Sequence, residues 1–529
     1  MNNLDSLVQT PSDRLSRLSG IPLDIILQHL DLASFTNLRL TSRQLSTSTI
    51  HCRFFRSAKT DLSVASIQSL TDRVSHPQLG PVLRELTVVA TLYDTHPAEA
   101  TVQTRKKWSG FDVEELRRDT ENYRQRVEDL RERNVDCTDE EVQEAQQDLE
   151  WMQARLQQDA DPGGSQVIRL LSSIFGLAVN LRVMNLDACI IGGRTKTCSP
   201  AEHHRWYRSD HQSSSWPSVW AAASETYHIV TLAISRSRIQ LEKLNIFPDT
   251  PACSVQLTHV EPNWIVVDVD DFAYACKKIT SFRLSFSTNT SVAMSPPAQG
   301  DPLVRHAFAA SSDHRSHPER DLEYCADAAA TLRFMHNLTS LDLHCYHPDN
   351  VLFTEYTRAF SFISQKIRLG CLKELSLRGL PLRPDDLILF LTNHPTITNL
   401  YLDGIHLVGG SWSPVFSCIE TMPALESLHL SSLSTESIHI INLEPVERTF
   451  EADPEDTEKW VRCGDGHILH TRDMCREEIQ QGLGFKPQPG PRNIWRDDLL
   501  SYFGRLQYEF GPSSSIWNWD PLNEDMLLV

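Results

Sequence analysis

Apolar residues recur along the chain in a short pattern, apolar-x-x-apolar-x-apolar, in which polar residues alternate with the last apolar ones. The pattern occurs eight times, at residues 83–88, 181–186, 241–246, 279–284, 338–343, 372–377, 397–402 and 425–430. Alternation with a period of two is typical of a β-strand that is buried on one face. We therefore expect eight short strands, several of them preceded by helices, for example at residues 351–365 and 384–392.

The spacing of the pattern indicates a repeat. The last three occurrences start 25 and 28 residues apart, and the earlier ones are 98, 60, 38, 59 and 34 residues apart. A strand of this kind every 20–29 residues resembles a leucine-rich repeat. The resemblance covers residues 83–433 and implies an α/β solenoid of parallel strands with helices on its convex side. A doubly wound sheet is the alternative, because the usual Asn or Cys position after the strand is largely missing.

Residues 18–45 predict two short helices at the N-terminus. Pro22 suits a first helical turn, and Asp24 suits the positive end of a helix dipole. Leu38 and Leu40 mark an apolar side of the second helix, whereas Arg43 belongs to another side. The alternative is an ordinary amphipathic helix pair with no dedicated partner.

This stretch resembles an F-box, the helical module that docks onto the Skp adaptor of cullin-based ubiquitin ligases, and its last run, Asn37 to Arg43, looks much like the F-boxes of filamentous fungi. Ile21-Pro22 stands for the usual Leu-Pro, and the run from Asn37 to Arg43 matches the second half of the motif. The resemblance implies adaptor contacts from these residues: Ile21, Pro22, Asp24, Ile25, Ile26, Leu30, Leu32, Leu38, Leu40 and Arg43.

Composition narrows the classes of partner. The net charge of −19 disfavours nucleic acid, whose phosphates require clustered Lys and Arg. No window of the sequence is apolar enough for a membrane span, and no signal peptide is evident, so we expect no membrane partner. The 12 cysteines are scattered singly, unlike those of a secreted disulfide scaffold. We therefore expect a cytoplasmic or nuclear protein.

A charged insert interrupts the repeats at residues 101–162. Residues 111–133 predict one helix, and the capping box of Thr138 and Glu141 opens a second one. Together they predict a helical hairpin, which is either a solvated insertion or a partner-binding arm. The expected domains are thus an F-box at residues 1–60, a solenoid at 61–445, and a C-terminal cap and tail at 446–529.

Candidate catalytic or metal-binding residues are few. The sequence contains no Gly-rich phosphate loop and no nucleophile elbow. Zinc-type ligand spacing occurs at Cys463, His467, His470 and Cys475, and more weakly at Cys198, His203, His204 and His211. We interpret both sets as incidental and expect no metal, no cofactor and no enzyme. The acidic pairs Asp270-Asp271 and Asp385-Asp386 are interpreted as helix-start or loop carboxylates.

The resemblance implies a division of labour between the two ends of the chain. The F-box binds the Skp adaptor and through it a cullin, while the repeats bind a protein substrate, so the chain is a substrate-recognition subunit of an SCF-type ubiquitin ligase. The polar strand positions that we expect to contact the substrate are Arg283, Asp342, His344, Arg378, Tyr401, Asp403 and His429. Of these, Arg378, Tyr401 and His429 are expected to add nothing to the core. The alternatives are a leucine-rich-repeat scaffold that does not direct degradation, and an enzyme with a dispersed site.

Overall fold

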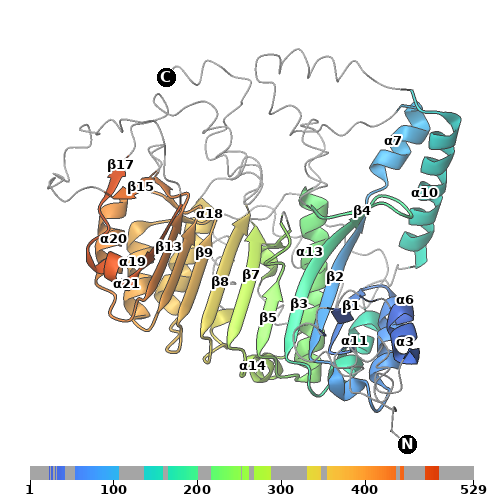
Figure 1. The fold of residues 1–529 in the computed structure, drawn as a ribbon, viewed down its shortest axis with the longest axis horizontal. Helices are drawn as coiled ribbons and strands as arrows, with labels where there is room; N and C mark the ends of the chain where they lie inside the picture. Colours follow the sequence, from blue (N-terminus) through green and yellow to red (C-terminus); the bar gives the residue numbers. More distant parts are fainter. Residues whose placement is uncertain are drawn as a thin grey trace, which may run out of the picture.

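The structure is a computed structural model of the chain, and it describes the following residues: 23, 26–27, 30, 32–41, 54–106, 136–158, 165–200, 216–251, 253–260, 267–287, 331–346, 354–435, 441–445 and 471–487. The predicted helix at residues 111–133 lies outside them. Within these residues the fold is α/β, with one large and mostly parallel sheet (Figure 1).

Each of the eight apolar patterns overlaps a strand that begins two residues after the start of the pattern. These strands lie side by side in the order in which they occur along the chain. The sheet contains, in spatial order, β1 (Ser57–Asp61), β2 (Glu85–Tyr93), β3 (Val183–Ile191), β5 (Lys243–Ile246), β7 (Ser281–Ser287), β8 (Ser340–Tyr346), β9 (Glu374–Arg378), β11 (Asn399–Asp403), β13 (Ser427–Ser431) and β16 (Thr471–Cys475). Neighbours along this path are parallel except β13 and β16, which are antiparallel. The order has no reversal, unlike that of a doubly wound sheet.

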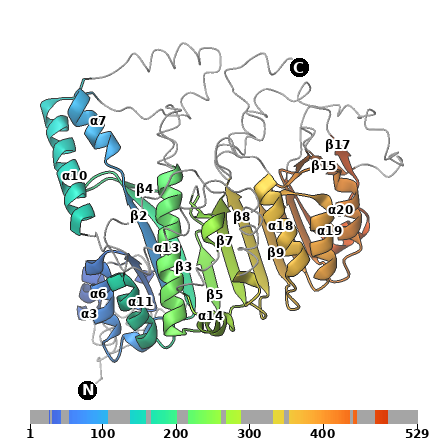
Figure 2. The same cartoon turned by 180° about the vertical axis from the view of Figure 1, so that it is seen from behind.

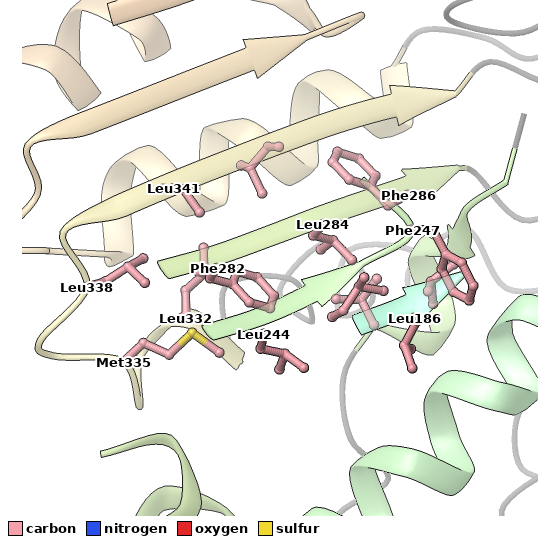
Figure 3. Close-up of a cluster of buried hydrophobic side chains, with 14 of the residues drawn as sticks. Leu186, Leu244, Phe247, Phe282, Leu284, Phe286, Leu332, Met335, Leu338 and Leu341 are labelled. Atoms are coloured by element: carbon pink, nitrogen blue, oxygen red, sulfur yellow. The ribbon is translucent and has the colours of Figure 1, made fainter. Parts of the chain in front are cut away.

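The same position of each pattern falls in one row across the sheet, because each strand pairs with the next without a shift. The row formed by the second apolar residue consists of Leu86, Met184, Leu244, Phe282, Leu341, Leu375, Leu400 and Leu428. Every member of this row is buried. Figure 3 shows how the central members pack against their neighbours, including Leu338 and Met335 from the turn before β8.

Helices cover the face of the sheet that carries these apolar rows (Figures 1 and 2). They are α6 (Val64–Val74), α11 (Ser165–Leu177), α13 (Trp216–Ser237), α14 (Val269–Cys276), α18 (Thr354–Lys366), α19 (Pro384–Asn393) and α20 (Trp412–Glu420). Two of them, α18 and α19, confirm the helices predicted near residues 351–365 and 384–392. As predicted, Asp270-Asp271 and Asp385-Asp386 lie in the first turns of α14 and α19.

Smaller elements complete the described fold. They are η1 (Gly80–Val82), η3 (Leu257–His259), α21 (Arg476–Gln480), β4 (Thr197–Cys198) beside β3, β6 (Val255–Gln256) beside β7, a parallel sheet of β10 (Pro381–Leu382), β12 (His406–Leu407) and β14 (Ser434–Thr435), and an antiparallel pair of β15 (Ile441–Pro445) and β17 (Phe485–Pro487). Within the described residues, no helix is both long enough and apolar enough to cross a membrane.

The second helix of the insert forms as predicted. It is α10 (Asp139–Gln158), and its capping box is present: the Thr138 amide donates to Glu141 at 3.0 Å, and the Glu141 amide donates to the Thr138 hydroxyl at 3.2 Å. In the described part of the chain α10 packs on α7 (His96–Thr104), a helix that was not predicted from the sequence. The two helices extend beyond the end of β2 (Figure 1).

Asp148 attaches α10 to the turn between β3 and β4. Its carboxylate is buried and accepts bonds from the Arg194 side chain at 3.0 Å and from Lys196 at 3.1 Å. Burial raises the pKa of Asp148, but the hydrogen bonds from Arg194 and Lys196 outweigh burial, so the pKa lies below its usual value. Gly193 leaves room for this contact, because a Cβ atom at this position would lie 2.4 Å from the Asp148 carboxylate, which would then have to shift.

Candidate binding face and N-terminal module

In each pattern one residue lies between the second and the third apolar position. Its side chain points to the face of the sheet opposite the buried apolar rows, and these residues form a polar row. In register order this first polar row consists of Thr87, Asn185, Asn245, Arg283, Asp342, Ser376, Tyr401, His429 and Asp473. A second polar row, two residues further along the strands, consists of Ser285, His344, Arg378, Asp403, Ser431 and Thr471. We call the two rows together the polar face.

All seven predicted substrate-binding residues belong to the two rows of the polar face. They differ in exposure: Asp342, His344 and Asp403 are only 8%, 5% and 6% exposed, whereas the other four, including Arg283, are half-buried. Alternation predicts the direction of a side chain but not what lies above it, which is why the sequence could not distinguish these two groups. Their role in binding a substrate stays a prediction.

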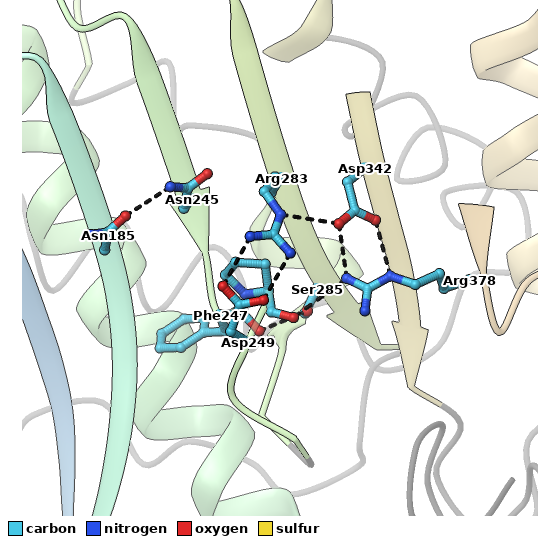
Figure 4. Close-up of polar contacts among 9 residues, drawn as sticks. Asn185, Asn245, Phe247, Asp249, Arg283, Ser285, Asp342 and Arg378 are labelled. Carbon is cyan, nitrogen blue, oxygen red and sulfur yellow. Dashed lines mark hydrogen bonds and ion pairs between the residues drawn. The ribbon is translucent and has the colours of Figure 1, made fainter. Parts of the chain in front are cut away.

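An ion-pair network joins three of these residues across neighbouring strands (Figure 4). The buried Asp342 carboxylate accepts from Arg283 Nε at 3.1 Å and from Arg378 Nε and Nη2 at 3.1 and 2.9 Å. The other side of the Arg283 guanidinium donates two bonds to Asp249, at 2.9 and 2.8 Å. Burial lowers the pKa of Arg283, but the Asp249 and Asp342 carboxylates outweigh burial and raise it.

The network changes one expectation from the sequence. We expected Arg378 to add nothing to the fold, yet it makes two charge-assisted hydrogen bonds to a buried carboxylate. Removing Arg378 would leave Asp342 with Arg283 as its remaining cation in this network. Arg378 is therefore a structural residue as well as a candidate contact residue.

Towards the N-terminal end of the sheet, the polar face continues as a hydrogen-bonded ladder. The Asn245 amide donates to Asn185 at 2.8 Å, and the Asn185 amide donates to Glu85 at 2.7 Å. Next to it, Lys59 of β1 donates to Asp187 at 2.7 Å. Burial raises the pKa of Asp187, but the bonds from Lys59 and Thr250 outweigh burial and lower it. Asn185 and Asn245 occupy the same pattern position as Arg283, a signal that could have included them in the prediction.

At the other end of the sheet, two predicted residues form an aromatic pair. The Tyr401 and His429 rings stack with centroids 4.0 Å apart and planes 3° apart. His429 Nδ1 lies 2.6 Å from the Asp473 carboxylate of β16. Because β16 pairs antiparallel after a long connection, no periodic signal in the sequence announces Asp473 or Asp249 as members of this surface.

The N-terminal module has a small core of its own, separate from that of the sheet. Leu23, Leu27 and Phe35 are buried in it, and the ring of Phe35 stacks on that of Phe54 with centroids 4.0 Å apart. Its described helix is α3 (Leu32–Leu40). The last residue of α3, Leu40, is 79% exposed.

The predicted adaptor-binding residues are only partly covered by the described residues. Leu30 and Leu38 pack against the small core, Ile26 is half-buried, and Leu32 begins α3. The remaining predicted residues, apart from Leu40, lie outside the described residues: Ile21, Pro22, Asp24, Ile25 and Arg43.

Of the two sets with metal-type spacing, only Cys198 and Cys475 lie within the described residues. Among those residues, no group of three or more His, Cys, Asp or Glu side chains is arranged to hold a metal ion. In comparisons with known proteins, no family model matches the chain, and no curated protein matches it. The F-box and the leucine-rich repeats therefore stay predictions from the residues quoted above.

Proposed function

We propose that this chain is the substrate-recognition subunit of an SCF-type ubiquitin ligase: an F-box at its N-terminus binds the Skp adaptor, and a leucine-rich-repeat solenoid binds a protein substrate. The observation that carries the proposal is the division of the molecule into two unlike parts. A small N-terminal core with the exposed Leu40 precedes a long sheet that follows chain order and presents a polar face.

The order of the strands supports the solenoid assignment. In a solenoid each repeat contacts chiefly its neighbours, so strand order follows chain order and long insertions are tolerated between repeats. The eight patterned strands have this order, and segments as long as residues 94–182 occur between two paired strands. A polar face with charged, aromatic and amide side chains suits a protein partner.

The exposed Leu40 supports the adaptor-binding assignment. An apolar side chain of this size contributes about 1.5–3 kcal/mol when a partner buries it. Leu40 ends the helix whose Phe35 and Leu38 belong to the small core, so this core fixes the position of Leu40.

Binding of the purified Skp adaptor to the full-length chain tests the proposal. We expect Leu40→Ala to weaken binding tenfold or more while the melting temperature is unchanged. The matched control is Leu156→Ala on α10, a leucine that is 46% exposed and distant in sequence from the module. If the unmodified chain does not bind the adaptor, the ligase assignment is wrong. The other outcome is that the chain binds the adaptor without directing degradation. In that case Leu40→Ala leaves the half-life of the protein bound at the polar face unchanged in cells, and the scaffold alternative replaces the ligase assignment.

A further inference from the structure

After β5 the chain makes a turn, Phe247–Thr250, that crosses the polar face. Phe247 has a left-handed backbone (φ 52°), which turns the chain sharply after the strand. Its carbonyl accepts from the buried Ser285 hydroxyl at 2.9 Å, and the carbonyl of Pro248 accepts from Arg378 at 3.4 Å. Thr250 donates to Asp187 at 2.8 Å. The turn is therefore fixed to β3, β7 and β9. Figure 4 shows its contacts with Ser285 and Arg283 of β7.

Asp249 differs from the rest of this turn. Phe247 and Thr250 are buried, but the Asp249 side chain is 76% exposed. Within the described residues its carboxylate is bound by Arg283, whose own exposure is 31%. An ion pair with so exposed a partner contributes about 0–1 kcal/mol, so the Asp249 side chain can rotate away at little cost while the turn stays in place.

The charges of the network favour one kind of group in place of the Asp249 carboxylate on Arg283. Arg283 and Arg378 balance Asp342 and Asp249, so the four-residue network is neutral as it stands. When Asp249 rotates away, the remaining three residues carry a single positive charge. The exposed edge of Arg283 then offers two parallel N–H donors, which match the two oxygens of one carboxylate. A phosphate dianion would overcompensate the site by one charge.

We propose that Asp249 is an internal stand-in for an acidic side chain of the bound partner. An aspartate or glutamate of the partner displaces the Asp249 carboxylate and takes its place on Arg283, while Asp342 and Arg378 hold the guanidinium in position. This inference rests on the proposed function, because it assigns the class of segment that the polar face recognises: an acidic peptide segment.

A selection from a random peptide library on the full-length protein tests this assignment. We expect the selected peptides to share one Asp or Glu, and we expect its replacement by the neutral amide to weaken binding. Asp249→Asn keeps the shape of the side chain and removes the competing charge, so it should strengthen binding of the acidic peptide up to about fivefold. The amide peptide should gain nothing from the same variant.

Asp139→Asn is the matched control, because Asp139 is also an exposed carboxylate paired with an arginine, Arg105, but it lies on α10 and not on the polar face. It should leave the affinity unchanged. The inference is overturned if no acidic position is selected, or if Asp249→Asn leaves the affinity of the acidic peptide unchanged. A phosphoserine peptide that binds more tightly than its glutamate counterpart would overturn the carboxylate assignment. Adaptor binding is measured in a separate experiment. If the chain binds the acidic peptide but not the adaptor, the ligase assignment is refuted and the inference about Asp249 is not.

Discussion

The last three patterned strands and the five before them share the same buried rows, but they are connected differently. In the C-terminal part, β9, β11 and β13 are each followed by a two-residue strand of the second sheet, β10, β12 or β14. The turn between them has a left-handed residue at the same place each time: Gly379, Gly404 and Ser432. Glycine adopts this conformation without strain, and Ser432 shows that the turn itself is required there.

In the N-terminal part the described patterned strands are not followed by strands of the second sheet, although Phe247 after β5 is also left-handed, and polar contacts that differ from one strand to the next hold the connections. β2 and β3 are nine residues long each, and the connections include α7, α10 and the turn at Phe247. Asp148, Asp187 and Asp342 each bind cations from other segments. The regular repeats thus share one local turn, whereas the irregular ones are held in addition by individual ion pairs between distant residues, one of which reaches Arg378 of β9.

The largest effect is expected from the core, where the two parts should respond alike. Leu284 in β7 and Leu402 in β11 lie in the same buried row. Each replacement by Ala should lower the free energy of unfolding by about 2–5 kcal/mol. Urea denaturation measures this loss. If only one of the two variants is destabilised, the two parts do not share one continuous core.

The next largest effect, weaker attachment of α10, should be confined to the N-terminal part. Gly193→Ala places a Cβ atom against the Asp148 carboxylate and should weaken its charge-assisted bonds, which contribute roughly 1.5–3 kcal/mol each. Gly192→Ala is the control, because a Cβ there meets no atom within 4 Å. Hydrogen exchange should show faster opening of α10 in the first variant and no change in the second. Equal exchange in both would mean that Asp148 does not hold the helix.

Buried histidines should make both parts sensitive to acid. Burial lowers the pKa of His259 to about 3, assisted by the charge of His228, and lowers that of His406 to about 4, from an ordinary value of 6.5. The unfolded chain therefore binds protons below about pH 6.5 that the folded chain cannot bind. Stability is fully present above that pH and should fall by up to about 1.4 kcal/mol per pH unit for each histidine as the pH decreases.

Urea midpoints measured between pH 7 and pH 5 check this dependence. Replacing His259 by Leu should make the curve shallower by the contribution of one group. An unchanged slope would show that His259 is protonated in the folded protein.

The smallest effect is expected at the C-terminal end of the polar face. His429→Ala removes a stacking partner of Tyr401 and an ion pair with an exposed carboxylate, so it should change the free energy of unfolding by about 1 kcal/mol or less. Arg378→Ala should destabilise more, because it deprives the buried Asp342 of one cation. Thermal melting of the two variants compares them directly. Equal melting temperatures would contradict the structural role assigned to Arg378.

The strands could be predicted from the sequence because their signal is local. Each pattern predicts which side chains face the core, and the repeat predicts which strands are neighbours. The polar face could therefore be predicted as the residues that alternate with buried ones such as Leu375 and Leu377. The ion-pair network could not be predicted, because Asp249 reaches Arg283 through a turn with no periodic pattern. Helix α7 was missed for a similar reason. Its short sequence, His96–Thr104, has a weak apolar stripe, and Ala98 packs with Ala145, which lies 47 positions further along the chain (145 − 98).

The reversed direction of β16 has a consequence for self-association. A stack of parallel repeats presents at its end a surface like the one between its own units, onto which another copy could add. Here β13 pairs instead with a strand of opposite direction, followed by the five-residue helix α21, and Met474, Ile479 and Leu483 bury the apolar side. Within the described residues, a copy added in the direction of the repeats would therefore meet a strand of opposite direction instead of a matching parallel one.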